Sequence, residues 1–208
     1  MAQPDPDHPQ IYLISPTAFD PMTFAPSLAS LLDAVEIACL RLAIAESDED
    51  AVARAADMCR EVAHARDVPL VIDRHVQLVE RLGLDGVHLT DGARSVRATR
   101  KTLGADAILG SYCAASRHDG MTAGETGADY ISFGPVGSTD LGDGTRAEAD
   151  LFAWWSQMIE LPVVAEGALD VALIEALAPV TDFFAIGPEI WRHEDPLRAL
   201  TELTAPLR

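Results

Sequence analysis

The sequence predicts a single α/β domain built as a closed (β/α)8 barrel of the TIM type. Short apolar runs alternate with longer amphipathic segments, a pattern typical of parallel strands joined by helical crossovers. Eight such pairs fit into 208 residues, which leaves no room for a second domain. An open doubly wound sheet is the alternative, but that fold usually has five or six strands.

Each predicted strand is a short apolar run that ends close to a polar residue or a glycine. In chain order, the strands are expected at residues 11–15, 36–42, 69–73, 86–89, 107–111, 130–134, 162–166 and 182–187. The carboxyl ends of these strands would all meet at one end of the barrel, and βα barrels place their chemistry there.

The segments between the strands have the spacing of amphipathic helices. In residues 48–65, the small apolar side chains that can share one helix face are Val52, Ala55, Ala56, Cys59 and Ala63. The last helix is expected at about residues 195–204, with Pro196 in its first turn, where a missing N–H costs little. The glycine- and acid-rich residues 137–150 are predicted to form a long loop, either a mobile connection or a substrate lid.

The ends and the composition of the chain exclude several classes of protein. Residues 1–9 have no basic or apolar signal and are predicted to be a disordered tail, with the barrel in 10–208. No run of eighteen apolar residues suggests a membrane span. With 15 basic and 33 acidic residues, the net charge of 15 − 33 = −18 argues against nucleic acid as a partner.

The cysteines and tryptophans bear on compartment and assembly. Cys39, Cys59 and Cys113 lack the spacing of metal ligands, so reduced thiols in a cytoplasmic protein are expected. A homodimer through exposed helix faces is one expectation, with tryptophans as candidate anchors: Trp154, Trp155 and Trp191. The alternative is that each tryptophan packs under its own helix.

Polar residues near the predicted strand ends form the candidate site. In chain order they are Arg41, Asp73, His88, Asp91, Tyr112, Cys113, Thr139, Glu166, Gly167 and Gly187. Asp73 could bind Mg²⁺ with Asp91 as its nearest partner, or could cap a helix. Arg41 could bind a carboxylate or phosphate, or form a salt bridge that closes the barrel. His88 could orient a ligand or lie hydrogen-bonded in the core.

A phosphate site is possible after the last two strands. Gly167 and Gly187 let an anion approach the backbone N–H groups there. Pro188 removes one donor, and the carboxylates of Glu166 and Glu189 bring negative charge close to the anion. A catalytic role for a cysteine thiol is disfavoured, because a nucleophile needs a lowered pKa and the surroundings are apolar.

Several segments in this order are similar to those of a known family. They are IYLIS at 11–15, LRL at 40–42, IDR at 72–74, GLDGVHL at 83–89, ILG at 108–110, GADYISFGPVGST at 127–139, PVVAEGA at 162–168 and DFFAIG at 182–187. Across nearly its whole length the chain resembles the thiamine phosphate synthase family, which includes the related thiazole tautomerases. The family has a βα-barrel fold.

The resemblance implies a transferase that joins hydroxymethylpyrimidine diphosphate to thiazole phosphate and releases diphosphate with the help of Mg²⁺. Carried over residue by residue, it implies that the chain keeps a diphosphate-binding arginine, a metal carboxylate, the histidine of the fourth strand, a loop threonine and a phosphate-binding glycine. These are Arg41, Asp73, His88, Thr139 and Gly167.

Other positions depart from the family. Where the family has a glutamine, a lysine, an asparagine and the second metal aspartate, this chain has Cys39, Ala43, Ile72 and Ala93. Where it has a serine and a histidine, and then a threonine and a lysine, this chain has Tyr112 and Ala114, and then Leu141 and Gly142. Where it has an isoleucine, a glycine and a serine, this chain has Glu166, Ala168 and Pro188. Each lost charged contact removes about 1.5–3 kcal/mol. The departures therefore predict a degenerate site, unless Asp91 or Asp140 supplies a metal ligand and Arg117 or Arg146 supplies charge.

The sequence is compatible with three functions. The first is thiamine phosphate synthesis. The second is a non-catalytic barrel that binds a neutral or cationic heterocycle, because desolvated acids repel anions. The third is an isomerase whose acid and base are Asp73 and His88, provided that the two side chains face each other.

Overall fold

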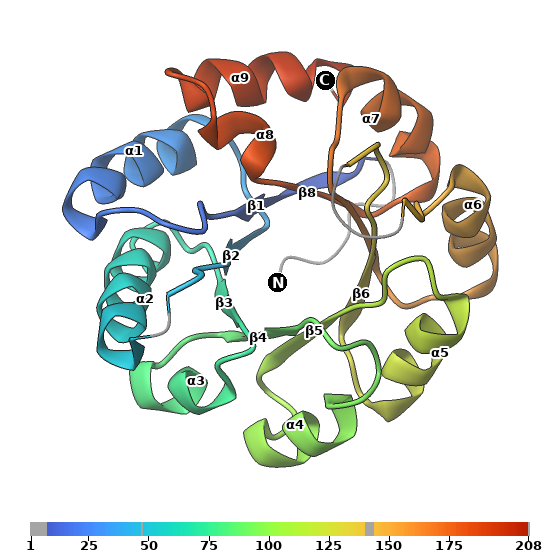
Figure 1. Cartoon of the computed structure of the whole chain (residues 1–208), viewed down its shortest axis with the longest axis horizontal. Helices are drawn as coiled ribbons and strands as arrows, with labels where there is room; N and C mark the ends of the chain where they lie inside the picture. The colour runs from blue at the N-terminus through green and yellow to red at the C-terminus, as the bar shows by residue number, and fades with distance from the viewer. Residues whose placement is uncertain (1–7, 47, 140–143, 208) are drawn as a thin grey trace.

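Eight parallel strands close into a barrel that is surrounded by helices, as predicted (Figure 1). The computed structural model describes residues 8–46, 48–139 and 144–207. The strands are β1 Gln10–Ile14, β2 Cys39–Leu42, β3 Leu70–Asp73, β4 Gly86–Leu89, β5 Ile108–Tyr112, β6 Tyr130–Phe133, β7 Val163–Glu166 and β8 Phe183–Ile186. They pair in chain order, and β1 pairs with β8 to close the ring.

The α-helices among the described residues lie between the strands and after β8. They are α1 Pro21–Ala34, α2 Glu49–His64, α3 Val76–Leu82, α4 Val96–Leu103, α5 Arg117–Thr126, α6 Ala149–Met158, α7 Val171–Leu177, α8 Pro188–Trp191 and α9 Pro196–Leu203. Short 3₁₀ turns follow at η1 Ala178–Val180 and η2 Ala205–Leu207. In the described part of the chain, no helix is long and apolar enough to span a membrane.

The sequence explains why two of these helices form where they do. The α2 face predicted from residues 48–65 is buried, and the Asp48 carboxylate accepts the N–H of Asp50 at the start of the helix. Pro196 occupies the first turn of α9, and Asp195 caps it by accepting the N–H of Arg198. Both helices therefore begin as the sequence predicts.

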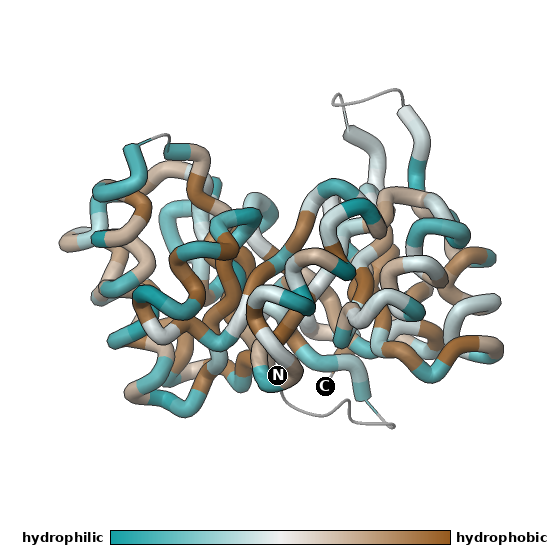
Figure 2. The backbone as a smooth tube through the Cα atoms, turned by 90° about the horizontal axis from the view of Figure 1, so that it is seen from below, coloured by the Kyte–Doolittle hydropathy of each residue, from teal (hydrophilic) through white to brown (hydrophobic). Residues whose placement is uncertain are grey.

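The core has two shells. The larger lies between the strands and the helices and is made of aliphatic and aromatic side chains. The smaller fills the inside of the barrel and includes Tyr12, Val71, Tyr130 and Phe183. In Figure 2, apolar segments run through the middle of the molecule, and apolar and hydrophilic segments alternate in the surrounding helices. Polar side chains that point into the inner shell near its carboxyl end can therefore meet across the barrel.

Candidate active site

A buried arginine lies at the carboxyl end of the barrel, where four strands bring polar and charged side chains together. Arg41, on β2, is only 7% exposed. One nitrogen of its guanidinium group, Nη1, donates to Glu166 Oε2 at 2.8 Å and to His88 Nε2 at 3.0 Å. That nitrogen carries two hydrogens, so both bonds can form at once. Strands that are distant in the sequence thus meet at one guanidinium.

Asp73, at the end of β3, lies on another side of the same guanidinium. Its Oδ1 atom is 3.4 Å from Arg41 Nε, and neither atom has a hydrogen-bond partner among the described residues. Burial raises the pKa of the Asp73 carboxyl to about 6, although Arg41 opposes this rise. For Arg41, burial acts to lower the pKa, but Glu166 and then Asp73 raise it overall. We attribute most of that effect to Glu166, because only Glu166 is hydrogen-bonded to the guanidinium.

His88 connects Arg41 to two tyrosines inside the barrel through a chain of hydrogen bonds. Arginine can only donate, so His88 Nε2 must accept and Nδ1 must carry the proton. His88 Nδ1 lies 3.0 Å from Tyr130 Oη, which lies 2.6 Å from Tyr12 Oη. Burial, and then the positive charge of Arg41, lower the pKa of His88 well below its usual value. His88 is therefore a neutral imidazole with both nitrogens bonded.

A glycine makes this arrangement possible. A Cβ atom on Gly110 of β5 would lie 2.0 Å from the ring of Tyr130 on the neighbouring strand. The Tyr130 ring can therefore lie against the β5 backbone only because residue 110 has no side chain.

The loops after β7 and β8 contain the predicted phosphate-binding glycines. Gly167 has a φ of +88°, a left-handed conformation that favours glycine. The N–H of Gly187 donates to Glu189 Oε2 at 3.0 Å, and the N–H of Leu169 donates to Glu189 Oε1 at 3.2 Å. Glu189 is buried. A carboxylate of the chain itself therefore holds two N–H groups of the predicted phosphate site.

The loop after β6 is described only in part. Thr139 lies at the edge of the described segment, and Asp140, Leu141 and Gly142 lie outside the described residues. Figure 2 shows the described parts on either side projecting from one end of the barrel. Helix α6 begins at Ala149, so the last residues of the predicted loop are helical.

Two arginines that could replace lost cations make other contacts in the structure. The Arg117 guanidinium lies 4.0 Å from the centre of the Trp154 ring, a cation–π contact. Arg146 pairs with Glu148 at 3.2 Å. Neither residue pairs with the Arg41 cluster in the described part of the chain.

The carboxylates present suit a magnesium ion that arrives with phosphate better than a resident one. Asp73 Oδ1 is a buried acceptor without a hydrogen bond, and Mg²⁺ commonly uses one or two carboxylates together with substrate phosphates. Asp91 is exposed and accepts the hydroxyl of Ser95 at 2.6 Å. Among residues 8–46, 48–139 and 144–207, no group of three or more His, Cys, Asp or Glu residues could hold a metal. The role of Asp91 as a ligand stays a prediction.

The cysteines are packed thiols. Cys39, Cys59 and Cys113 are all buried and free. Burial raises the pKa of each thiol to about 12, so none is a thiolate near neutral pH. The burial of Cys113 agrees with the interpretation of this residue as a packed thiol.

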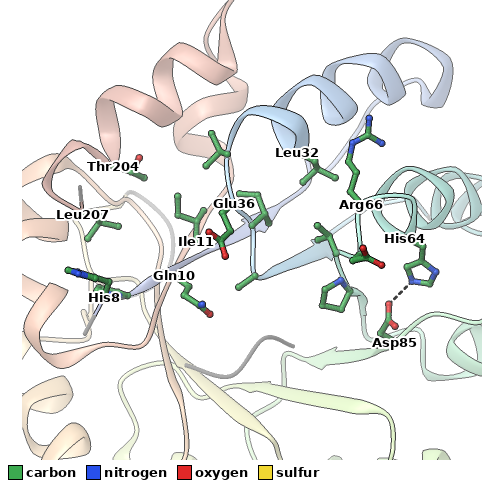
Figure 3. Close-up of a pocket in the computed structure, with 17 residues that line it drawn as sticks. His8, Gln10, Ile11, Leu32, Glu36, His64, Arg66, Asp85, Thr204 and Leu207 are labelled. Atoms are coloured by element: carbon green, nitrogen blue, oxygen red, sulfur yellow. Dashed lines mark hydrogen bonds and ion pairs between the residues drawn. The ribbon is translucent and has the colours of Figure 1, made fainter. Parts of the chain in front are cut away.

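A large cavity lies at the opposite end of the barrel, where the strands begin (Figure 3). It measures about 1110 Å³ and is lined by residues that include Gln10, Glu36, Arg66 and His64. His64 pairs with Asp85 at 2.7 Å, and the same Asp85 oxygen accepts the N–H of Leu70. We place the candidate site at the carboxyl end instead, because the buried charged cluster lies there.

Sequence reasoning located most of this cluster but not its bonding. Arg41, Asp73, His88 and Glu166 were all predicted near strand ends, and the structure brings them together. The tyrosines beneath His88 were missed, because tyrosine within an apolar strand is indistinguishable from core packing. The register that places Tyr130 beside Gly110 of β5 is visible only in the structure.

Comparisons with known proteins identify the family of the chain. A family model described as thiamine monophosphate synthase matches residues 11–186. The thiamine-phosphate synthase of Rhodospirillum centenum is 38% identical over 204 residues, which cover 96% of this chain and 98% of that protein. The thiamine-phosphate synthase of Erythrobacter litoralis is 35% identical over 195 residues, covering 89% of this chain and 90% of that protein.

Solved structures give the same fold. The thiamine phosphate pyrophosphorylase from Pyrococcus furiosus superposes with a TM-score of 0.83 at 18% identity and covers 97% of this chain and 96% of that one. A 3-hexulose-6-phosphate synthase superposes with a TM-score of 0.68 at 14% identity, covering 95% of this chain and 100% of that one. At these identities the likeness establishes the barrel and nothing finer.

Proposed function

Because the chain belongs to the thiamine monophosphate synthase family, we propose that it joins hydroxymethylpyrimidine diphosphate to thiazole phosphate at the carboxyl end of the barrel. In this reaction the thiazole nitrogen forms a bond to the methylene carbon of the pyrimidine. The bond from that carbon to the diphosphate oxygen breaks, and diphosphate leaves with the electron pair.

The observation that carries the proposal is the position of Arg41. A departing diphosphate gains negative charge as its bond to carbon breaks, so a fixed cation beside it lowers the barrier. Arg41 is buried, held at Nη1 by two partners, and lies at the end of the barrel where the strands terminate. We assign it the role of binding the diphosphate, together with Thr139.

The remaining roles follow from what each group can do. Bound Mg²⁺, held by Asp73 and Asp91, would neutralise further charge on the diphosphate. We assign the backbone at Gly167 and Gly187 to the phosphate of the thiazole, which must compete with Glu189 for the Gly187 N–H. His88 is a positioning residue, because its neutral ring orients Arg41.

A binding protein for a neutral or cationic heterocycle is the second candidate, and one observation favours it. Asp73 and Glu166 place two carboxylates around the single guanidinium of Arg41, so the cluster is negative when all three are charged. The isomerase alternative has less support. Asp73 and His88 are backbone neighbours across β3 and β4, but both His88 nitrogens are already bonded.

The test is to measure diphosphate release with both substrates at millimolar concentration and Mg²⁺. We expect release in equal amount to thiamine phosphate formed, and a loss of at least about 100-fold in kcat/KM for Arg41→Lys, because an ammonium lacks the planar fork with which a guanidinium binds a diphosphate through two nitrogens. Arg97→Lys, on the exposed side of α4, is the matched control and should be neutral. No release above background would refute the transferase, and stabilisation by basic heterocycles alone would favour the binding protein.

A further inference from the structure

Glu166 occupies Arg41 at the place where an anionic substrate would bind. Its Oε2 atom is 2.8 Å from Arg41 Nη1, and its side chain is 13% exposed. The resemblance noted above places an isoleucine at this position in the family. Glu166 places a negative charge at the last residue of β7.

The bonding of Arg41 leaves little room for a new acceptor at Nη1. Both hydrogens of that nitrogen are committed, one to Glu166 and one to His88. His88 is fixed by Tyr130 underneath, whereas Glu166 is the last residue of its strand and is partly exposed. Of the two bonds, the one to Glu166 can be exchanged without disturbing the inner core.

The local backbone keeps Glu166 close to the arginine. A Cβ atom on Gly134, after β6, would lie 2.3 Å from the backbone oxygen of Glu166 and 3.0 Å from its Cγ atom. The neighbouring Tyr112 hydroxyl donates to the Gly134 carbonyl at 2.6 Å. The β6 and β7 ends are thus packed so that the Glu166 side chain has a definite position.

We propose that Glu166 is a specificity-determining residue that acts as an internal counter-anion. Its carboxylate pairs with Arg41 before the substrate binds, and the diphosphate of the substrate then displaces it from the guanidinium. This inference rests on the proposed function. An anion that binds Arg41 at Nη1 must replace the Glu166 bond, and it then lies close to two carboxylates. Glu166 therefore weakens binding of free phosphate and diphosphate, and favours ligands that bring cationic charge with them.

The direct test uses inorganic diphosphate without metal, titrated calorimetrically into the wild-type chain and into Glu166→Gln. Glutamine keeps the shape but removes the charge. We expect the Kd for diphosphate to fall by about tenfold or more, because a neutral amide is a weaker acceptor than a carboxylate and is more easily displaced from Arg41. Glu175→Gln, an exposed position on α7, is the matched control and should leave Kd unchanged. An unchanged or raised Kd in Glu166→Gln overturns the proposal.

A second background separates this role from a purely structural one. In an Arg41→Met chain, Glu166→Gln should no longer change the Kd by a factor of ten, because the guanidinium that it frees is gone. An equal gain in both backgrounds would mean that Glu166 acts by general repulsion, which also overturns the proposal. If Glu166→Gln does not fold, Glu166→Ile serves in the same titrations.

The coupling assay distinguishes failure of this inference from failure of the proposed function. If the wild-type chain couples the substrates, Glu166→Gln should lower KM for the diphosphate substrate by about tenfold, and an unchanged KM with unchanged Kd defeats only the role of Glu166. If the wild-type chain shows no coupling but Glu166→Gln binds diphosphate more tightly, the transferase proposal fails and the counter-anion role stands.

Discussion

At the residue scale, the Asp73 carboxyl controls a pH dependence. Its pKa is raised to about 6 by burial, against an ordinary value of 3.8. A raised carboxyl pKa means that the folded state holds the proton more tightly, so its contribution to stability is present below pH 4 and is lost as pH rises through 6. The loss is about 3 kcal/mol, at about 1.4 kcal/mol per pKa unit.

We therefore expect Asp73→Asn to be more stable than the wild type at pH 7 and to match it near pH 4. Urea unfolding at several pH values measures this difference. A stability difference that does not vary with pH would show that Asp73 titrates normally.

The hydrogen-bond chain under Arg41 gives a second prediction at this scale. Tyr130→Phe would leave His88 Nδ1 and the Tyr12 hydroxyl without their partner at fully buried positions. We expect a loss of about 1–3 kcal/mol in the free energy of unfolding, measured by urea denaturation. Tyr112→Phe, at a partly exposed position, is the comparison and should cost less. Equal effects in the two variants would contradict a special role for the buried chain.

The charged residues of the site were predictable, but their pairing was not. Arg41, Asp73 and Glu166 could be placed near strand ends because periodicity locates the strands. Arg41 and Glu166 are 125 positions apart, and their contact depends on the way the barrel closes. Sequence spacing does not determine that geometry.

At the element scale, the aspartates that directly precede β4, β6 and β8 form hydrogen bonds between neighbouring strands at the amino-terminal end of the barrel. Asp85, Asp129 and Asp182 each accept the N–H of a residue on the preceding strand, at 2.7, 2.7 and 2.8 Å. Each bond satisfies a backbone donor at the first or second residue of a strand. The repeat fixes neighbouring strands in register.

Asp129→Ala tests this device, because Asp129 also pairs with Arg100 at 2.5 Å. We expect a loss of about 1–2 kcal/mol in the free energy of unfolding from the unpaired Leu109 N–H. Asp106→Ala, exposed in the neighbouring loop, should be neutral. A loss below about 0.5 kcal/mol for Asp129→Ala would argue against the register role.

Element positions followed from the sequence better than element ends did. The second strand was expected at residues 36–42 but begins at Cys39. Ile37 and Ala38 are buried and prolong the apolar run before the regular ladder starts. A buried approach to a strand has the same composition as the strand, so the boundary could not be found from the pattern.

At the scale of the whole molecule, a net charge of −18 opposes compaction. We expect the melting temperature to rise by several degrees as NaCl is raised from about 0.02 M to about 0.5 M, because salt screens the repulsion between exposed carboxylates. Scanning calorimetry measures this. A melting temperature that falls with salt would mean that favourable ion pairs outweigh the repulsion.

The predicted dimer has fewer anchors than the sequence suggested. Trp155 is buried and donates to the Leu161 carbonyl, and Trp191 donates to the Ile14 carbonyl. Trp154 packs with Arg117. The tryptophans thus serve their own chain, and a homodimer stays a prediction for analytical ultracentrifugation.

The most direct measurement of the central claim is a crystal structure with diphosphate and Mg²⁺. We predict diphosphate at the carboxyl end of the barrel, paired with Arg41, with the Glu166 carboxylate turned away from the guanidinium. Diphosphate in the cavity at the opposite end, or a site in which Arg41 keeps Glu166 and no anion approaches it, would contradict the account.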